Sequence, residues 1–315
     1  MSPPSRLAIA ALALSLSAAS AQPQAFRKTF TVAPSQPVEL EIALSSGDVQ
    51  VSYSHDGEVS IVASGQAPDG SPLGANYLGS IFAVEQRGNH IGLHNVAAVK
   101  STRKISYRID VPYRTEVASK VDHGLQTFTG IMGPVKAEGG DGDIKAAYVS
   151  LGMQARTGAG NLQFDVIGDH VTARTESGNI SATRIERGVD AETGDGDISL
   201  IVIGNSKATV TQGTGRVEVE AVKGRFSGST QAGDIHVKAE AHGDWNLRSA
   251  SGTIRVKLPP AQKADLEAHT ASGSLLVERE DLDPPLTEPR HLAQKLHGGG
   301  PRIEIYSEAG KILIR

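Results

Sequence analysis

The chain has 315 residues and no cysteine, with 39% hydrophobic side chains, 4% aromatic side chains and a formal net charge of -4. The lack of cysteine excludes disulfides, thiolate catalysis, cysteine-ligated zinc and lipid attachment through an N-terminal cysteine. The small negative charge gives no electrostatic reason to expect a nucleic-acid partner. Composition therefore favours a protein without thiol chemistry that does not bind nucleic acid.

Residues 1–21 resemble a secretion signal. Arg6 supplies the positive start, Leu7 to Leu16 form an apolar stretch, and Ala19-Ser20-Ala21 provides small residues for cleavage. The apolar stretch is too short to span a bilayer, so we interpret it as a cleaved signal peptide and not as an anchor. No later stretch reaches spanning length. The sequence therefore predicts an exported protein, located in the periplasm, on the outer cell surface or outside the cell, without a transmembrane segment.

The regular part of the chain, residues 121–315, contains a glycine that recurs at spacings of 18 to 21 residues, with one final interval of 37. Each such glycine is followed two residues later by Ile, Leu or Val. A period of this size is the sequence signature of a solenoid, in which glycine occupies a tight corner. The predicted corner glycines are Gly142, Gly160, Gly178, Gly196, Gly215, Gly233, Gly252, Gly273 and Gly310.

Apolar residues alternate with polar residues on both sides of each corner, which predicts two strands per period, each with one buried face. The position three residues before the glycine carries hydroxyl or amide side chains. We expect these side chains to form a buried ladder whose members hydrogen-bond to one another from coil to coil. The predicted ladder residues are Thr157, Thr175, Thr193, Gln212, Thr230, Ser249, Thr270 and Ser307.

Two segments depart from the period. Residues 22–120 alternate like strands but lack regular glycines, so we expect either irregular first coils or a capping β region. The 77 residues from Gly47 to Gly124 exceed four periods by five. Residues 278–301 are rich in proline and glycine and predict an extruded loop within one coil, after which Ile303 and Ile305 return to the register.

The predicted fold is all-β: a single-stranded parallel β-helix, or β-solenoid, with coils of about 18 residues. Ten coils rising about 4.8 Å each would form a rod on the order of 50 Å long. Its narrow interior would hold small aliphatic side chains and few rings. The last strand, Ile312 to Arg315, has no apparent cap. We therefore expect it to be covered by the 278–301 loop or paired end to end with a second copy.

Several segments resemble the DUF4097 family, a group of exported bacterial β-strand-repeat proteins that are labelled "putative adhesins". The resemblance rests on repeated Ser-Gly-Asp-Val and Ser-Gly-Asn-Ile corners, on Ile109-Asp110-Val111-Pro112 before the regular repeat, and on Gly300-Pro301-Arg302-Ile303 near the end. It covers nearly the whole mature chain. It implies a single-stranded parallel β-helix with a right-handed coil and implies no catalytic residues.

Two acidic glycine motifs suggest calcium, namely Gly139-Gly140-Asp141-Gly142-Asp143 and Gly194-Asp195-Gly196-Asp197. A calcium β-roll needs a nine-residue period, and the two motifs would lie three coils, or about 14 Å, apart. We therefore interpret these residues as turn formers and predict no metal site and no cofactor.

Catalytic candidates are equally weak. Glu218 and His236 align on neighbouring coils, and Arg156 and Arg174 align with Glu192, but exposed charge ladders of this kind need no function. His90 and His94 have a helical metal spacing in a segment that alternates like a strand, which argues against zinc. Trp245 occupies an inward position and is assigned to the core. We predict no catalytic residue.

Two functional hypotheses follow. The first is a non-enzymatic exported scaffold that binds a protein or glycan at the cell surface, as an adhesin does. The second is a polysaccharide-binding or polysaccharide-cleaving β-helix whose site combines the 278–301 loop with an adjacent coil face. End-to-end assembly of copies would fit either hypothesis.

Overall fold

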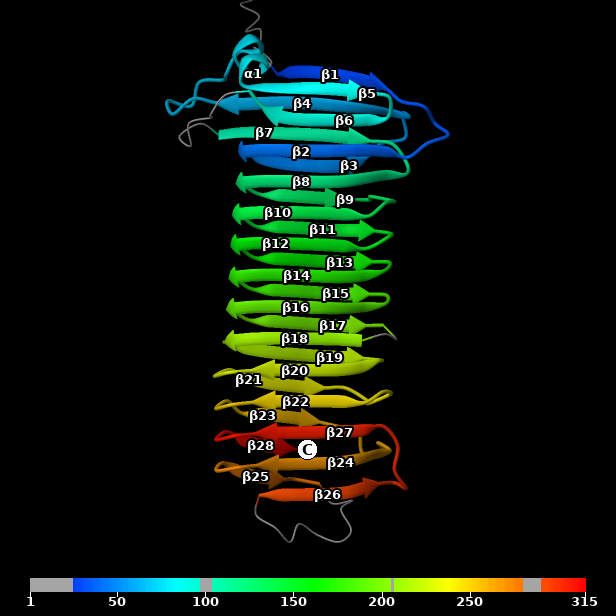
Figure 1. Ribbon diagram of the computed structural model, residues 1–315, viewed down its shortest axis with the longest axis vertical. Coiled ribbons are helices and arrows are strands. Elements are labelled where there is room, and N and C mark those ends of the chain that lie inside the picture. Colours follow the sequence, from blue (N-terminus) through cyan, green and yellow to red (C-terminus); the bar gives the residue numbers. More distant parts are fainter. Residues whose placement is uncertain (1–24, 97–103, 205–206, 280–289) are drawn as a thin grey trace, which may run out of the picture.

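The computed structural model describes residues 25–96, 104–204, 207–279 and 290–315. Two long sheets face each other across a narrow apolar interior, and the coils stack into a rod (Figure 1). Apart from its two ends, each sheet is built from parallel strands that follow one another every 18 or 19 residues. The predicted all-β solenoid is therefore confirmed. The predicted signal peptide lies outside the described residues.

The first sheet, called sheet A, contains fourteen strands in the described part of the chain. In spatial order these are β1 (Phe26–Thr31), β4 (Glu58–Gln66), β7 (Lys104–Val111), β3 (Asp48–Tyr53), β9 (Gln126–Thr129), β11 (Ile144–Val149), β13 (Leu162–Ile167), β15 (Ile180–Ile185), β17 (Ile198–Ile203), β19 (Arg216–Val222), β21 (Asp234–Lys238), β23 (Ile254–Lys257), β28 (Lys311–Ile314) and β25 (Ser274–Val277).

Sheet B also contains fourteen described strands. From the same end of the rod these are β5 (Phe82–Arg87), β6 (His90–Asn95), β2 (Val38–Ser46), β8 (Thr115–His123), β10 (Val135–Asp141), β12 (Met153–Ala159), β14 (His170–Ser177), β16 (Gly188–Asp195), β18 (Lys207–Thr214), β20 (Arg225–Thr230), β22 (Trp245–Ser249), β27 (Arg302–Ser307), β24 (Ala264–Thr270) and β26 (His291–Leu296).

The corner glycines form a continuous column because their backbones approach too closely for any side chain. A Cβ added to Gly160 would lie 2.2 Å from the carbonyl oxygen of Gly142, and one added to Gly178 would lie 2.1 Å from that of Gly160. The same contact joins the regular coils to the N-terminal region, where a Cβ on Gly124 would lie 2.3 Å from the Gly47 carbonyl oxygen. Only glycine therefore permits this coil spacing.

Both chain ends are threaded into the rod. Near the C-terminus, β27 lies between β22 and β24, and β28 lies between β23 and β25 (Figure 1). Near the N-terminus, β2 and β3 stack directly on β8 and β9, while β6 and β7 lie farther out. The 77-residue interval is thus an excursion of the chain outward and back.

Antiparallel strands end the parallel stacking at three of the four sheet edges in the described part of the chain, whereas β25, at the fourth, pairs parallel with β28. At the N-terminal end, β4 pairs antiparallel with β7 and β1, and β5 pairs antiparallel with β6. Helix α1 (Ala75–Ile81) buries Leu78 and Ile81 over this end of the core. At the other end, β26 pairs antiparallel with β24. Edges that are short, twisted away or covered resist unwanted strand addition.

Two expectations about the C-terminal end were wrong. The strand β28 is an interior strand, paired with β23 and β25, so residues 312–315 are not the edge that was expected to be covered by the 278–301 loop or paired with a second copy. The predicted extruded loop contains the strand β26, and its residues 280–289 lie outside the described residues. The spacing could not reveal that the terminal coil lies between two earlier coils, because a coil keeps the same alternation whichever neighbours it has.

The interior also holds more rings than expected. Trp245, Tyr107, Phe128, Phe164 and Phe226 are fully buried. Space for them comes from small neighbours; a Cβ on Gly228, for example, would approach the ring of Phe226 to 3.0 Å. The low aromatic content of the chain therefore reflects alternating large and small residues in the core.

In the described part of the chain, α1 has only seven residues, and no helix has the length and apolar character that crossing a bilayer requires.

The glycine column predicts a steric cost at Gly160. We expect Gly160→Ala to lower the free energy of unfolding by roughly 1–3 kcal/mol, because the coils must separate or shift to admit the methyl group. Gly92→Ala is the matched control, since nothing lies within 4 Å of a Cβ at Gly92. Urea denaturation measures both variants. Equal stability of the two would contradict the steric account of the column.

Candidate functional site

The eight ladder residues are placed inside the rod, next to the corner column. Their exposed fractions range from 0% for Ser307 to 6% for Thr230. They come from the sheet B strands at the position just before each corner, namely Thr157, Thr175, Thr193, Gln212, Thr230, Ser249, Thr270 and Ser307. No catalytic geometry surrounds them, so their contribution is to the interior of the fold.

The hydrogen bonds of this column differ from the expectation. The Thr175 hydroxyl donates to the carbonyl of Gly160 at 3.1 Å, and the Thr193 hydroxyl donates to that of Gly178 at 3.0 Å. Farther along, Ser249 instead accepts from the amide of Gly252 at 2.8 Å. The hydroxyls bind corner backbone because glycine leaves those carbonyl and amide groups uncovered. Each such bond contributes about 1 kcal/mol, and leaving its buried partner unsatisfied costs more.

A second polar column explains the acidic glycine motifs. The residue after each corner uses its side-chain oxygen to accept the backbone amide of the next coil. Asp143 accepts from Asn161 at 2.8 Å, Asn161 accepts from Asn179 at 3.0 Å, and Asn179 accepts from Asp197 at 2.8 Å. Within the described ranges no group of three or more His, Asp or Glu side chains is arranged to hold a metal ion. These acidic residues therefore connect coils.

The predicted Glu218–His236 neighbours do align on β19 and β21. The imidazole, however, is bonded to a cation: Nη1 of Arg255 lies 2.6 Å from Nε2 of His236. Burial, and next the charge of Arg255, lower the pKa of His236. A neutral imidazole can accept from the guanidinium, whereas a protonated one would repel it. The imidazole of His236 therefore accepts a hydrogen bond from Arg255 and is not paired with the carboxylate of Glu218.

The remaining sequence candidates are separate surface or core contacts. Arg174 forms an exposed ion pair with Glu192 at 3.0 Å. His94 lies 3.8 Å from Glu85. Trp245 is 1% exposed and packs edge to face against Phe226 with ring centroids 6.5 Å apart.

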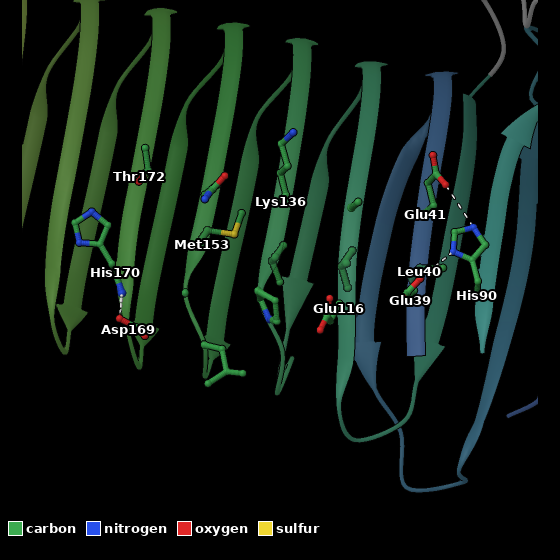
Figure 2. A pocket seen from close by; sticks show the side chains of 17 residues that line it. Glu39, Leu40, Glu41, His90, Glu116, Lys136, Met153, Asp169, His170 and Thr172 are labelled. Carbon is green, nitrogen blue, oxygen red and sulfur yellow. Dashed lines mark hydrogen bonds and ion pairs between the residues drawn. The ribbon is translucent and has the colours of Figure 1, made fainter. Parts of the chain in front are cut away.

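A groove lies on the outer face of sheet B, where the N-terminal strands meet the first regular coils, and sequence reasoning missed it. It has a volume of about 550 Å³ and crosses β6, β2, β8, β10, β12 and β14 (Figure 2). We call it the acidic groove and define it by Glu39, Glu41, His90, Glu116, Pro134, Leu151, Asp169 and His170. Small residues make room for it, because Ala118 and Gly152 replace longer outward side chains in its floor.

One wall of the acidic groove runs along the rod axis and is formed by residues at or just before the starts of successive sheet B strands. Glu39, Glu116 and Pro134 all stand eight residues before a corner, while Leu151 and Asp169 stand nine before one. Carboxylates therefore occupy the two ends of the wall and apolar groups its middle. Leu151 is 59% exposed, so the middle of the wall presents an apolar surface to the solvent. Because the wall combines two neighbouring positions of the coil, no single row of equivalent residues in the sequence contains it.

The negative charge of the acidic groove is only partly balanced. Glu39 and Glu116 are direct neighbours on β2 and β8, and like charges placed so repel. His90 is shared between Glu39, at 3.4 Å, and Glu41, at 3.5 Å. Among the described residues Glu116 forms no ion pair. The ammonium of Lys136 is held by Glu138 at 2.9 Å, and this contact lowers the pKa of Glu138.

A second hollow, of about 590 Å³, lies on sheet B near the C-terminal end. The threaded terminal coil creates it by placing Tyr306 between Arg248 and His269. The Tyr306 and His269 rings stack with centroids 5.8 Å apart, and His291 meets His269 at 6.0 Å. His291 belongs to the predicted 278–301 loop, so this is the place where that segment meets an adjacent coil face.

The family of the chain follows from comparison with known proteins. The model of the toastrack DUF4097 family matches residues 39–315, so the chain belongs to that family. The resemblance found in the sequence is thereby confirmed. No curated protein sequence matches the chain.

Two solved structures are similar over most of their length. A "putative adhesin" from Bacteroides fragilis NCTC 9343 shares 12% identity with a TM-score of 0.40, covering 93% of this chain and 98% of its own. A "putative cell adhesion protein" from Clostridium sporogenes ATCC 15579 shares 10% identity with a TM-score of 0.26, covering 92% and 98%. At these identities and TM-scores the similarity supports no conclusion about binding or activity.

The contact of His236 with Arg255 gives a prediction about pH. We expect the imidazole of His236 to titrate below its ordinary value of 6.5, and Arg255→Met to raise that midpoint. Because the unfolded chain would take up this proton more readily, His236 weakens stability as the pH falls below 6.5.

NMR titration of the imidazole measures this midpoint. Lys238→Met, on the same strand β21 as His236, is the control and should leave the midpoint nearly unchanged. A midpoint at or above 6.5 in the unsubstituted protein would contradict the contact.

Proposed function

We propose that this protein is a non-catalytic, exported binding scaffold of the cell envelope that acts as an adhesin. The observation that carries the proposal is the acidic groove with its exposed apolar middle at Leu151. An exposed apolar group set in a hollow and surrounded by charged groups is typical of an interaction site.

The scaffold suits binding because the groove is preformed. The strands that cross beneath it are hydrogen-bonded to neighbours in register, as β8 is to β2 and β10. Their inward side chains, such as Val117 and Val135, are fixed in the core. A rigid surface loses little conformational entropy when a partner binds, so more of the contact energy appears as affinity.

A non-catalytic role fits the setting of the titratable groups. The carboxylates Glu39 and Glu41 beside His90 are 66% and 62% exposed. At an open surface, water screens the charges that a catalytic site would use to stabilise a transition state. Export is supported by the signal-like segment 1–21.

Adhesion of coated beads tests the proposal. Beads carrying the mature chain should bind intact bacterial cells, and Leu151→Asp should lower the number bound by about tenfold, because it buries a charge against the partner. Leu276→Asp is the control, since Leu276 is also exposed, at 40%, and lies away from the groove on β25, the last strand of sheet A. Absence of adhesion, or equal loss with both variants, would overturn the proposal.

A second candidate function is glycan binding at the C-terminal hollow. It is favoured by the Tyr306 and His269 rings beside hydrogen-bonding groups, where Asn246 donates to Glu304 at 2.9 Å. Rings with adjacent planar polar groups suit the apolar and hydroxyl faces of sugars. A polysaccharide binding panel with Tyr306→Ala tests it. Release of soluble oligosaccharide in that panel would instead favour the cleaving alternative.

A further inference from the structure

We propose that the acidic groove binds an extended cationic peptide segment of a partner protein, lying along the rod axis. This inference rests on the proposed function, since it names the chemistry of the partner that the groove would hold. The length of the groove, the order of its chemical groups and its charge each support it.

The length of the groove fits a short extended chain. From β6 to β14 the groove crosses five steps between neighbouring strands. At about 4.8 Å a step this is about 24 Å, which an extended peptide covers with about seven residues.

The order of groups along the wall predicts the spacing of the peptide. From β8, which carries Glu116, to β14, which Asp169 precedes, there are three steps, or about 14 Å. In an extended chain, side chains four residues apart point to the same side and are separated by nearly this distance. Two basic residues at positions i and i+4 would therefore face Glu116 and Asp169.

The residue between them meets the apolar part of the wall. The side chain at i+2 points to the same side and lies about 7 Å along, between β10 and β12. Pro134 directly precedes β10, Leu151 lies two residues before β12, and both are exposed. The groove thus selects a basic, apolar, basic pattern on one side of an extended segment.

Charge complementarity argues for a cation over a neutral ligand. Glu116 forms no ion pair with any described residue, and its neighbour Glu39 shares one imidazole with Glu41. Asp169 is paired with Arg187 at 3.6 Å, so a bound cation would share that carboxylate, while Lys136 is held by Glu138. A bound ammonium or guanidinium would relieve the repulsion between the glutamates.

A synthetic peptide tests the spacing directly. The probe is fluorescein-labelled Ser-Lys-Ser-Leu-Ser-Lys-Ser, and the comparison is its isomer Ser-Lys-Ser-Leu-Lys-Ser-Ser, which has the same composition and charge. Fluorescence polarisation with the mature protein at low ionic strength measures both. We expect the first peptide to bind at least about fivefold more tightly, the effect of correctly placed surface ion pairs.

Variants separate this site from general attraction. Glu116→Gln with Asp169→Asn should weaken binding of the first peptide about fivefold and remove the preference over the isomer. The control is Glu192→Gln with Glu220→Gln, which removes the same amount of charge at two glutamates away from the groove. Circular dichroism confirms that both double variants fold.

The outcomes are decisive for the inference. Lack of binding, equal binding of the two peptides, or equal loss in both double variants would overturn it. Bead adhesion that depends on Leu151 while the peptide fails to bind would leave the scaffold function standing and reject the cationic segment as its partner.

Discussion

The fold depends on the close approach of backbone at the corner column. The carbonyl oxygen of each corner glycine occupies the place where a Cβ of the next would lie, at distances such as 2.5 Å for Gly215 and 1.8 Å for Gly252. This contact fixes the rotation of each coil against the next. Once the corner is fixed, strict alternation decides which side chains enter the core and which face the solvent.

The polar columns follow from the same constraint. Because glycine leaves its carbonyl and amide exposed to the interior, a Thr in the next coil can donate to the carbonyl, as Thr175 does to Gly160. A Ser three residues before the corner can accept from the amide, as Ser249 does from Gly252. Because the chain turns tightly, the Asp or Asn that follows can reach the amide of the next coil. The acidic glycine motifs and His236 thus take part in hydrogen bonds between coils. A binding site is therefore expected among the other outward-facing residues.

The sequence predicted the coil well and the order of coils poorly. The glycine period and the alternation determine the two strands of each coil, since they are local consequences of the corner. The position of the terminal coil is different. Its residues Ile303 and Ile305 keep the same phase whether the coil lies after Gly273 or between Gly252 and Gly273. The order of coils along the rod is a tertiary property, because it depends on which strands pair and not on the pattern within a coil.

The candidate site shows a similar division. The sequence identified the C-terminal segment that contributes His291 to one hollow, but it did not reveal the acidic groove. Glu39 and Glu116 are 77 residues apart, and the missing period between them hid their direct pairing. Threading of both chain ends therefore does more than protect the edges of the sheets. It brings distant segments together on the outer face of sheet B, where we place the function.

The most direct test of this account concerns the spatial order of the column Gly252, Gly310, Gly273. Because the chain has no cysteine, a single introduced pair reports one contact. Arg248 and Tyr306 are register partners on β22 and β27, whereas Arg248 and His269 are separated by β27. Neighbouring parallel strands lie within disulfide distance, and strands two apart do not. Oxidation should cross-link Arg248→Cys with Tyr306→Cys and leave Arg248→Cys with His269→Cys reduced. The reverse result would mean that the coils stack in sequence order and would contradict the account.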